Sequence, residues 1–167
     1  MENASWHDVL RNDRPLIFGI LNCTPDSFSD GGKYANVVDV QNRITQLIDD
    51  GSDVIDFGAE STRPGAKEVS FEEQLSRVEP VFGYLKNVSS RKILFSCDTR
   101  NSEVASKSIE SGVKIINDVS GGSHDLKMLD VIASNKSLCV LMHMRGNPEN
   151  MNSLAKYNNV VDDVCSE

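Results

Sequence analysis

Five short apolar runs recur along the chain, and each ends directly before a polar residue that can take part in chemistry. The pairs are Leu16–Leu21 before Asn22, Val54–Ala59 before Glu60, Ile93–Cys97 before Asp98, Val113–Ile116 before Asn117, and Leu138–Met142 before His143. Such runs, separated by helical stretches, are typical of βα units that build a parallel sheet. In these sheets the carboxyl ends of the strands line one shared site. The pattern therefore predicts an α/β protein with its site just beyond the strands.

The stretches between the runs carry signals for helices. Apolar residues fall on one helical face from Val37 to Ile48, and Gly51 follows as a stop. Ser70 and Glu73 form a capping-box pair before a second apolar stripe. Pro80 lies inside that stripe, and we expect it to bend or break the helix. Three further helical stretches are expected, near Val104, Leu126 and Tyr157.

The length of 167 residues suits one domain with a sizeable core. We expect a polar N-terminal segment, residues 1–14, followed by one domain of five βα units over residues 15–167. An eight-unit barrel typically needs about 250 residues. An open five-stranded sheet of the flavodoxin type would fit the length on its own. Length and periodicity leave both architectures open.

Composition limits the classes of partner. The chain is 39% hydrophobic and 25% charged, as in ordinary globular proteins. Its net charge of −8 argues against nucleic-acid and anionic-membrane partners, and no apolar stretch reaches the length of a membrane span. The four cysteines form no CxxC pair, which favours a reducing compartment. Three of them, Cys23, Cys97 and Cys139, lie in or beside predicted strands and are expected to be apolar fillers. We expect a cytoplasmic protein, with an organellar location of a larger parent protein left open.

The loop after the first run, Asn22 to Gly32, is rich in oxygen ligands and turn formers. Asn22, Asp26 and Asp30 could present oxygen to Mg²⁺, which prefers such ligands. Phe28 lies among polar residues, where an aromatic ring has little reason to be unless it covers something. The alternative is a Ser/Asp turn held by its own backbone bonds.

The loop after the second run, Glu60 to Ala66, pairs a hydroxyl with an arginine at the mouth of a strand. Arg63 could bind phosphate through its forked guanidinium, and the following Pro-Gly would fix the turn that aims it. The alternative is a surface arginine that bonds to Glu60.

Two further side chains, Asp98 and Asn117, are expected side by side over the sheet. Together they could bind a flat heterocycle that offers N–H donors and ring acceptors. Alternatively, Asp98 caps the next helix. His143 has no metal-ligand partner at suitable spacing, so we interpret it as structural.

Five stretches together resemble the dihydropteroate synthases, a pterin-binding family of folate biosynthesis. They are Gly19–Gly32, Glu60–Ala66, Ser96–Thr99, Ile115–Gly122 and Leu141–Pro148, and they follow the family's order. The resemblance implies a (β/α)₈ TIM barrel of which about five units are present. It implies condensation of 6-hydroxymethyl-7,8-dihydropterin diphosphate with p-aminobenzoate, with release of diphosphate and with Mg²⁺ as cofactor. It also implies a sulfonamide target, and a homodimer for full-length members.

Carried over position by position, the resemblance implies catalytic roles for Asp98 and Arg63. It implies that Asn22 and Asp30 lie at the metal. The implied substrate contacts are Asn22, Thr62 and Arg63 for diphosphate, Asp98, Asn117 and Met142 for the pterin, and Phe28 and Pro64 for p-aminobenzoate.

The family's later segments, an Asp-Pro-Gly, a Ser-Arg-Lys and an Arg-x-His, do not occur here. We therefore expect the chain to be the N-terminal part of a longer barrel and to be inactive alone. One alternative is a pterin-binding methyltransferase, which has no reason to carry the two loops described above. Another is a non-catalytic pterin-binding fragment, which predicts pterin affinity without turnover.

Overall fold

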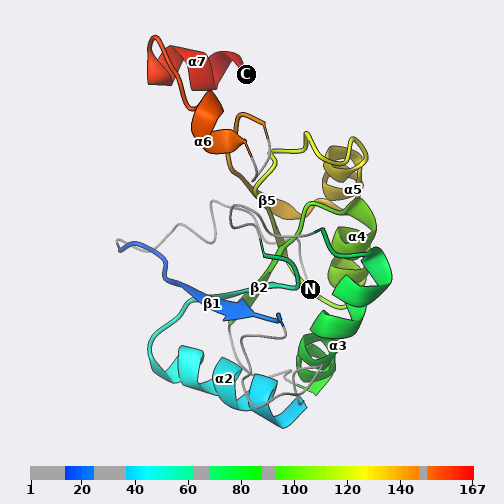
Figure 1. Cartoon of the computed structure of the whole chain (residues 1–167). Helices are drawn as coiled ribbons and strands as arrows, with labels where there is room; N and C mark the ends of the chain where they lie inside the picture. The colour runs from blue at the N-terminus through cyan, green and yellow to red at the C-terminus, as the bar shows by residue number, and fades with distance from the viewer. Residues whose placement is uncertain (1–13, 25–36, 62–67, 88–92, 147–149) are drawn as a thin grey trace.

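Five parallel strands form one sheet, in which the strands pair in the order in which they occur along the chain (Figure 1). The computed structural model describes residues 14–24, 37–61, 68–87, 93–146 and 150–167. The strands are β1 Phe18–Asn22, β2 Val54–Gly58, β3 Leu94–Asp98, β4 Ile115–Asp118 and β5 Leu138–Leu141. The helices are α2 Val37–Asp49, α3 Phe71–Asn87, α4 Ser102–Glu110, α5 Met128–Asn135, α6 Met151–Leu154 and α7 Val160–Ser166.

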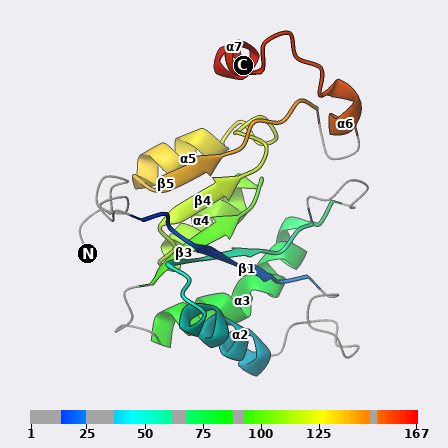
Figure 2. The ribbon, with the colours of Figure 1, turned by 90° about the vertical axis from the view of Figure 1, so that its left-hand side faces the viewer.

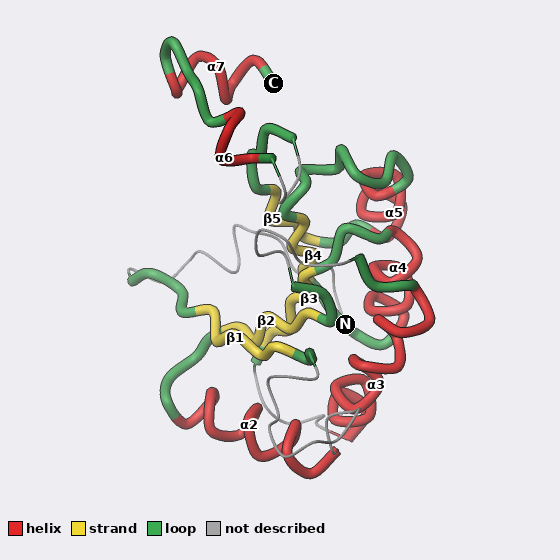
Figure 3. Tube along the Cα trace, viewed as in Figure 1, coloured by secondary structure: helices red, strands yellow, loops and turns green. Residues whose placement is uncertain are grey.

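The strand order decides between the two architectures that the length left open. The order is β1-β2-β3-β4-β5, and every neighbouring pair is parallel. A flavodoxin-type sheet has the order 2-1-3-4-5, with helices on both faces. Here helices α2 to α5 follow the sheet along one side (Figures 1 and 3). The chain therefore has the arrangement of consecutive units in a (β/α)₈ barrel, and the prediction of barrel-type units is confirmed.

The core lies mainly between the sheet and these helices. Alternate strand residues point toward the helices, and their side chains pack against the apolar stripes of α2, α3, α4 and α5. The fully buried members of this cluster include Ile55, Phe57 and Ile116. A smaller cluster of Val54, Ile115 and Leu138 lies on the opposite face, toward the amino ends of the strands. The two faces of the sheet thus carry separate apolar clusters.

Helix α3 tests two local predictions from the sequence, the cap at Ser70 and the effect of Pro80. Ser70 Oγ accepts a hydrogen bond from the backbone N–H of Glu73, so the Ser70 half of the predicted capping box forms, while Glu73 Oε1 accepts a hydrogen bond from Arg77. The expected break at Pro80 is absent, because α3 runs from Phe71 to Asn87 with Pro80 inside it. Proline removes the hydrogen bond to the carbonyl four residues earlier, and that residue, Ser76, is exposed and open to water. Burial of Val78 and Val81 on either side holds the helix together.

The last two helices lie away from the sheet (Figures 1 and 2). The predicted helical stretch near Tyr157 is realised as α7, which begins at Val160. His143 Nε2 lies 2.8 Å from Glu167 Oε2, and the Arg145 guanidinium lies 4.1 Å above the ring of Tyr157. These contacts join the segment after β5 to α7, in agreement with the structural role expected for His143. Within the described part of the chain, no helix combines the length and apolar character needed to cross a membrane.

Candidate active site

The register of the sheet brings the predicted polar residues to one level at its carboxyl edge. Asn22 is paired with Gly58, Gly58 with Asp98, and Asp98 with Asn117. Paired residues point to the same face of a sheet, so these side chains project from the face opposite α2 to α5. The prediction that Asp98 and Asn117 lie side by side is confirmed.

Asp56 is part of the same group, although the sequence reasoning missed it. It lies in the middle of β2 and is only 6% exposed. Its Oδ2 accepts a hydrogen bond of 3.0 Å from Asn117 Nδ2. The missing signal was strand alternation, because a residue two positions before Gly58 shares the face of Gly58. The prediction of site residues rests only on the residues that end the apolar runs, and Asp56 lies inside one of them.

The two carboxyl groups retain buried oxygens with free hydrogen-bonding capacity. Asp56 Oδ1 and Asp98 Oδ1 are buried and have no hydrogen-bond partner among the described residues. Such atoms are rare in folded proteins, because leaving one unpaired costs about 1–3 kcal/mol. Both oxygens accept hydrogen bonds when ionised, so the site suits a ligand that offers N–H donors.

Burial also changes the acidity of the site. It raises the pKa of Asp98 to about 7, and the nearby carboxylates of Asp56, Asp118 and Glu60 add to this effect. Arg100 opposes it. Burial likewise raises the pKa of Asp56, whereas the side chains of Ser96 and Asn117 act in the opposite direction. Near neutral pH, Asp98 is therefore poised between its acid and carboxylate forms.

The residue between Asn22 and Asp98 is a glycine for a steric reason. A Cβ atom on Gly58 would lie 3.2 Å from both the Cβ and the backbone oxygen of Asp98. The absence of a side chain therefore leaves room for the carboxyl group of Asp98. This glycine belongs to the site even though it carries no chemistry of its own.

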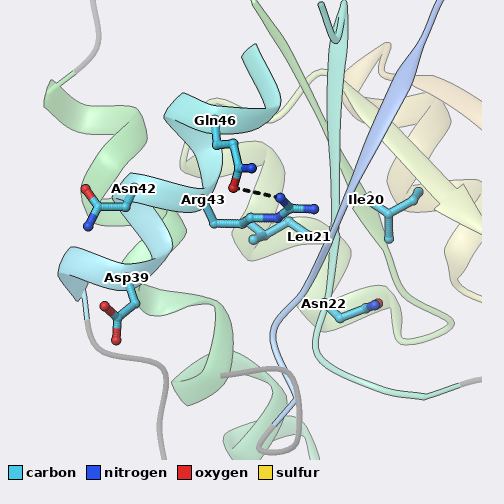
Figure 4. A pocket seen from close by; sticks show the side chains of 7 residues that line it. All are labelled: Ile20, Leu21, Asn22, Asp39, Asn42, Arg43 and Gln46. Carbon is cyan, nitrogen blue, oxygen red and sulfur yellow. Dashed lines mark hydrogen bonds between the residues drawn. The ribbon is translucent and has the colours of Figure 1, made fainter. Parts of the chain in front are cut away.

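Asn22 and Met142 lie at the margins of this group. Asn22 is exposed and lines a cleft of about 510 Å³ between β1 and α2, with Ile20 on its strand and Arg43 on the helix (Figure 4). Met142 follows β5, is 40% exposed, and donates its backbone N–H to the Asp118 carbonyl. Both residues thus lie at the carboxyl ends of strands, as predicted.

One alternative interpretation from the sequence, that Asp98 caps the next helix, can now be settled. Asp98 does not cap α4, because the Asn101 side chain accepts from the N–H groups of Glu103 and Val104. Glu60 is engaged by Arg100, with 3.0 Å between Arg100 Nη2 and Glu60 Oε2. The predicted residues Phe28, Asp30, Thr62, Arg63 and Pro64 lie outside the described residues.

Two further features bear on reactivity, namely the state of the cysteines and the presence or absence of a cluster of metal ligands. All four cysteines are free thiols. Cys23 and Cys97 are buried, and burial raises the pKa of Cys23 to about 12, which suits an inert filler. Cys165 is exposed and so is not a filler. The described residues contain no group of three or more His, Cys, Asp or Glu side chains that could hold a metal ion.

Comparisons with known proteins agree with this geometry. A family model described as pterin binding enzyme matches residues 18–167. The folate synthesis bifunctional protein of Arabidopsis thaliana is 45% identical, over 92% of this chain and 32% of that protein. The dihydropteroate synthase of Bacillus subtilis is 43% identical, over 93% of this chain and 51% of that enzyme.

Solved structures give the same result. The Yersinia pestis dihydropteroate synthase, in complex with a sulfonamide drug, superposes with a TM-score of 0.80 at 38% identity, covering 92% of this chain and 55% of that one. The Xanthomonas albilineans dihydropteroate synthase with 4-aminobenzoic acid gives 0.76 at 38% identity, covering 92% and 53%. The chain therefore spans about half the length of the dihydropteroate synthases that it matches.

Proposed function

Since this chain belongs to the pterin-binding enzyme family, we propose that it forms the pterin- and diphosphate-binding part of a dihydropteroate synthase. The reaction joins 6-hydroxymethyl-7,8-dihydropterin diphosphate to p-aminobenzoate and releases diphosphate. The observation that carries the proposal is the group of Asp56, Asp98 and Asn117 on one face of the sheet. The dihydropteroate synthases named above, at about 40% identity, support the choice of reaction.

The pterin ring is the ligand that best suits these three side chains. Its edge presents adjacent N–H donors and ring acceptors, which match a carboxylate beside a carboxamide. Asp98 and Asp56 each offer a buried oxygen that has no hydrogen-bond partner among the described residues. The Asn117 carboxamide is held by its bond to Asp56, so its orientation is set before a ligand arrives. Met142, at the end of the neighbouring strand, would form part of the apolar wall.

The diphosphate would lie toward Asn22 and the loop that carries Thr62 and Arg63. Arg63 would bind phosphate oxygens and offset the charge that develops on the leaving group. Asn22 is an exposed oxygen donor at a strand end, which suits Mg²⁺, an ion usually held by one or two protein ligands plus substrate phosphates. Asp30 would be the second protein ligand. When bound, Mg²⁺ would supply neutralisation of the diphosphate charge.

The protein's own part in the reaction is mainly positioning and electrostatics. Loss of diphosphate leaves positive charge on the pterin methylene carbon, and the ionised Asp98 carboxylate would stabilise it. The bond between this carbon and diphosphate breaks first, and the amino nitrogen of p-aminobenzoate then attacks the carbon. A C–N bond forms, and the amino group gives up one proton, which the released diphosphate can accept. Phe28 and Pro64 would cover the arylamine and exclude water. No protein nucleophile is required.

The test is p-aminobenzoate-dependent release of diphosphate. Residues 1–167 would be assayed alone and joined to the C-terminal half of the Bacillus subtilis enzyme, in each case with Mg²⁺. We expect turnover by the joined protein, and loss of at least about 100-fold in its Asp98→Asn variant, as is typical when an electrostatic stabiliser is removed. Diphosphate release that is independent of p-aminobenzoate, or methyl transfer from methyltetrahydrofolate, would contradict the proposal.

A further inference from the structure

A chain of buried and partly buried polar contacts ties the two ends of the loop 61–68 to the residues next to Asp98. Glu60 and Val69 flank this loop, and both are described by the structure. Glu60 Oε1 accepts the backbone N–H of Val69 at 3.2 Å. Gln74 Nε2 donates to the backbone carbonyl of Val69 at 2.9 Å. Both peptide groups of Val69 are therefore held by side chains, and the two ends of the loop are joined.

The same two side chains are anchored to the segment that follows β3. Arg100 Nη2 lies 3.0 Å from Glu60 Oε2, and these two side chains are only 11% and 6% exposed. Thr99 Oγ1 donates to Gln74 Oε1 at 3.3 Å. Thr99 and Arg100 directly follow Asp98 along the chain. The contacts thus form a closed ring through Glu60, Val69, Gln74, Thr99 and Arg100.

We propose that Glu60, Gln74, Thr99 and Arg100, here termed the Val69 clamp, are positioning residues that hold the two ends of the loop 61–68, at Glu60 and Val69, next to the segment that follows Asp98. This inference rests on the proposed function, in which the loop carries Thr62 and Arg63 and Asp98 contacts the pterin. The clamp contacts the two ends of the loop, and it would act on the ligand only through the loop residues between those ends. Its effect should therefore fall on the diphosphate part of the ligand.

The burial of the clamp supports a positioning role over a general stabilising one. A buried ion pair costs desolvation of both groups, and its net effect on stability is often close to zero. The pair instead restricts geometry, because the Glu60 carboxylate must bind the Arg100 guanidinium and accept a hydrogen bond from the Val69 amide at the same time. By contrast, the Lys107–Glu110 pair on α4 is more than half exposed on both sides. That pair provides a matched control.

The first measurement is amide hydrogen exchange at Val69 in residues 1–167. Glu60→Ala should accelerate exchange at Val69 about tenfold, the effect of losing a hydrogen bond to a charged group. Glu60→Gln keeps an acceptor oxygen and should produce a smaller change. Glu110→Ala should leave Val69 unchanged. Unaltered exchange at Val69 in Glu60→Ala would overturn the clamp.

The second measurement is calorimetric binding of two ligands, 6-hydroxymethyl-7,8-dihydropterin and its diphosphate with Mg²⁺. Glu60→Ala and Gln74→Met should weaken binding of the diphosphate form about tenfold and change binding of the free pterin less than about twofold. An equal loss for both ligands would indicate general loss of structure and would overturn the positioning role. If the wild-type chain binds neither ligand, the proposed function fails. The rate of amide exchange at Val69 in the Glu60→Ala variant still tests the clamp independently.

Discussion

The two faces of the sheet are built from alternate residues of the same strands, yet they have opposite characters. On the face toward α2–α5, Ile55, Phe57 and Ile116 are fully buried among apolar neighbours. On the other face, apolar residues near the amino ends give way to Asp56, Asp98 and Asn117 near the carboxyl ends. One face stabilises the fold, and the other holds carboxyl groups at a cost in stability.

The physical reason for the difference is the direction of the strands. Fully burying a large apolar side chain contributes about 1.5–3 kcal/mol, so the helix-covered face accounts for much of the stability. At the carboxyl ends, the chain leaves the sheet in loops that can surround a ligand. The raised pKa values of Asp56 and Asp98 show that this end tolerates unfavourable burial of charge. Four substitutions can break or sharpen the comparison.

The largest effect is expected on the helix-covered face. Phe57 is fully buried and meets Phe82 edge to face, with 6.1 Å between ring centroids. Phe57→Ala should lower the free energy of unfolding by about 3–5 kcal/mol through lost burial and a cavity. Urea denaturation would measure this loss, with Phe57→Leu as the conservative control. A loss below about 1 kcal/mol would contradict the assignment of this face as the main source of stability.

The next effect has the opposite sign and depends on pH. Because the folded-state pKa of Asp98 is raised from 3.8 to about 7, ionising this group opposes folding. Below about pH 4 the group is protonated in both states, and this penalty is absent. Between about pH 4 and 7 the wild type should lose stability relative to Asp98→Asn as pH rises, and above about pH 7 the difference should stay constant. At one pKa unit per 1.36 kcal/mol, we expect a final difference of about 2–4 kcal/mol.

Thermal or urea unfolding of both proteins from pH 4 to 8 would measure this difference. The control is Asp53→Asn: the Arg14 guanidinium lowers the pKa of Asp53, so Asp53 is ionised in both the folded and the unfolded state above about pH 4. The difference in stability between wild type and Asp53→Asn should therefore stay constant from about pH 4 to 8. Parallel stability curves for wild type and Asp98→Asn would show that Asp98 carries no such penalty.

A smaller effect is expected at the contact between β2 and β4. Asn117→Ala removes the donor to Asp56 Oδ2 and leaves that buried oxygen without this bond. We expect a loss of about 1–2 kcal/mol at pH 8 and a smaller loss at pH 4, because burial raises the pKa of Asp56 and its charged fraction increases with pH. Urea denaturation at the two pH values would test this. An identical loss at both values would mean that the hydrogen bond does not depend on the charge of Asp56.

The smallest effect is expected at the surface. Glu110→Ala breaks the exposed pair with Lys107 on α4 and should change the free energy of unfolding by less than about 0.5 kcal/mol. Urea denaturation in low salt is the measurement. A loss above about 1 kcal/mol would mean that exposed charges contribute as much as the site contacts, and the contrast between faces would weaken.

The sequence predicted the strands and the site edge because both depend on local patterns. Asp98 and Asn117 follow apolar runs, and parallel strands bring such positions together. The strand order could not be predicted from periodicity, since open sheets and barrels share the same βα pattern. Pro80 was expected to bend or break its helix, and tertiary packing keeps that helix unbroken from Phe71 to Asn87.

Asp56 and the Val69 clamp were missed for a different reason. Asp56 lies inside a strand, and its role emerges only when Asn117 on β4 reaches it across the sheet. The clamp joins Glu60 to Arg100, which are forty positions apart. Contacts of this kind depend on three-dimensional proximity, which no local pattern encodes.

The most direct test of the account is calorimetric titration of residues 1–167 with 6-hydroxymethyl-7,8-dihydropterin. It would be carried out near pH 6 in two buffers of different ionisation enthalpy. Ring N–H groups favour the ionised Asp98, so binding should release up to about one proton, because the pKa of the free carboxyl is about 7. In Asp98→Asn, both the affinity and the proton release should fall. Binding that is unchanged in Asp98→Asn, or the absence of binding by the wild type, would contradict the assignment of this face as the pterin site.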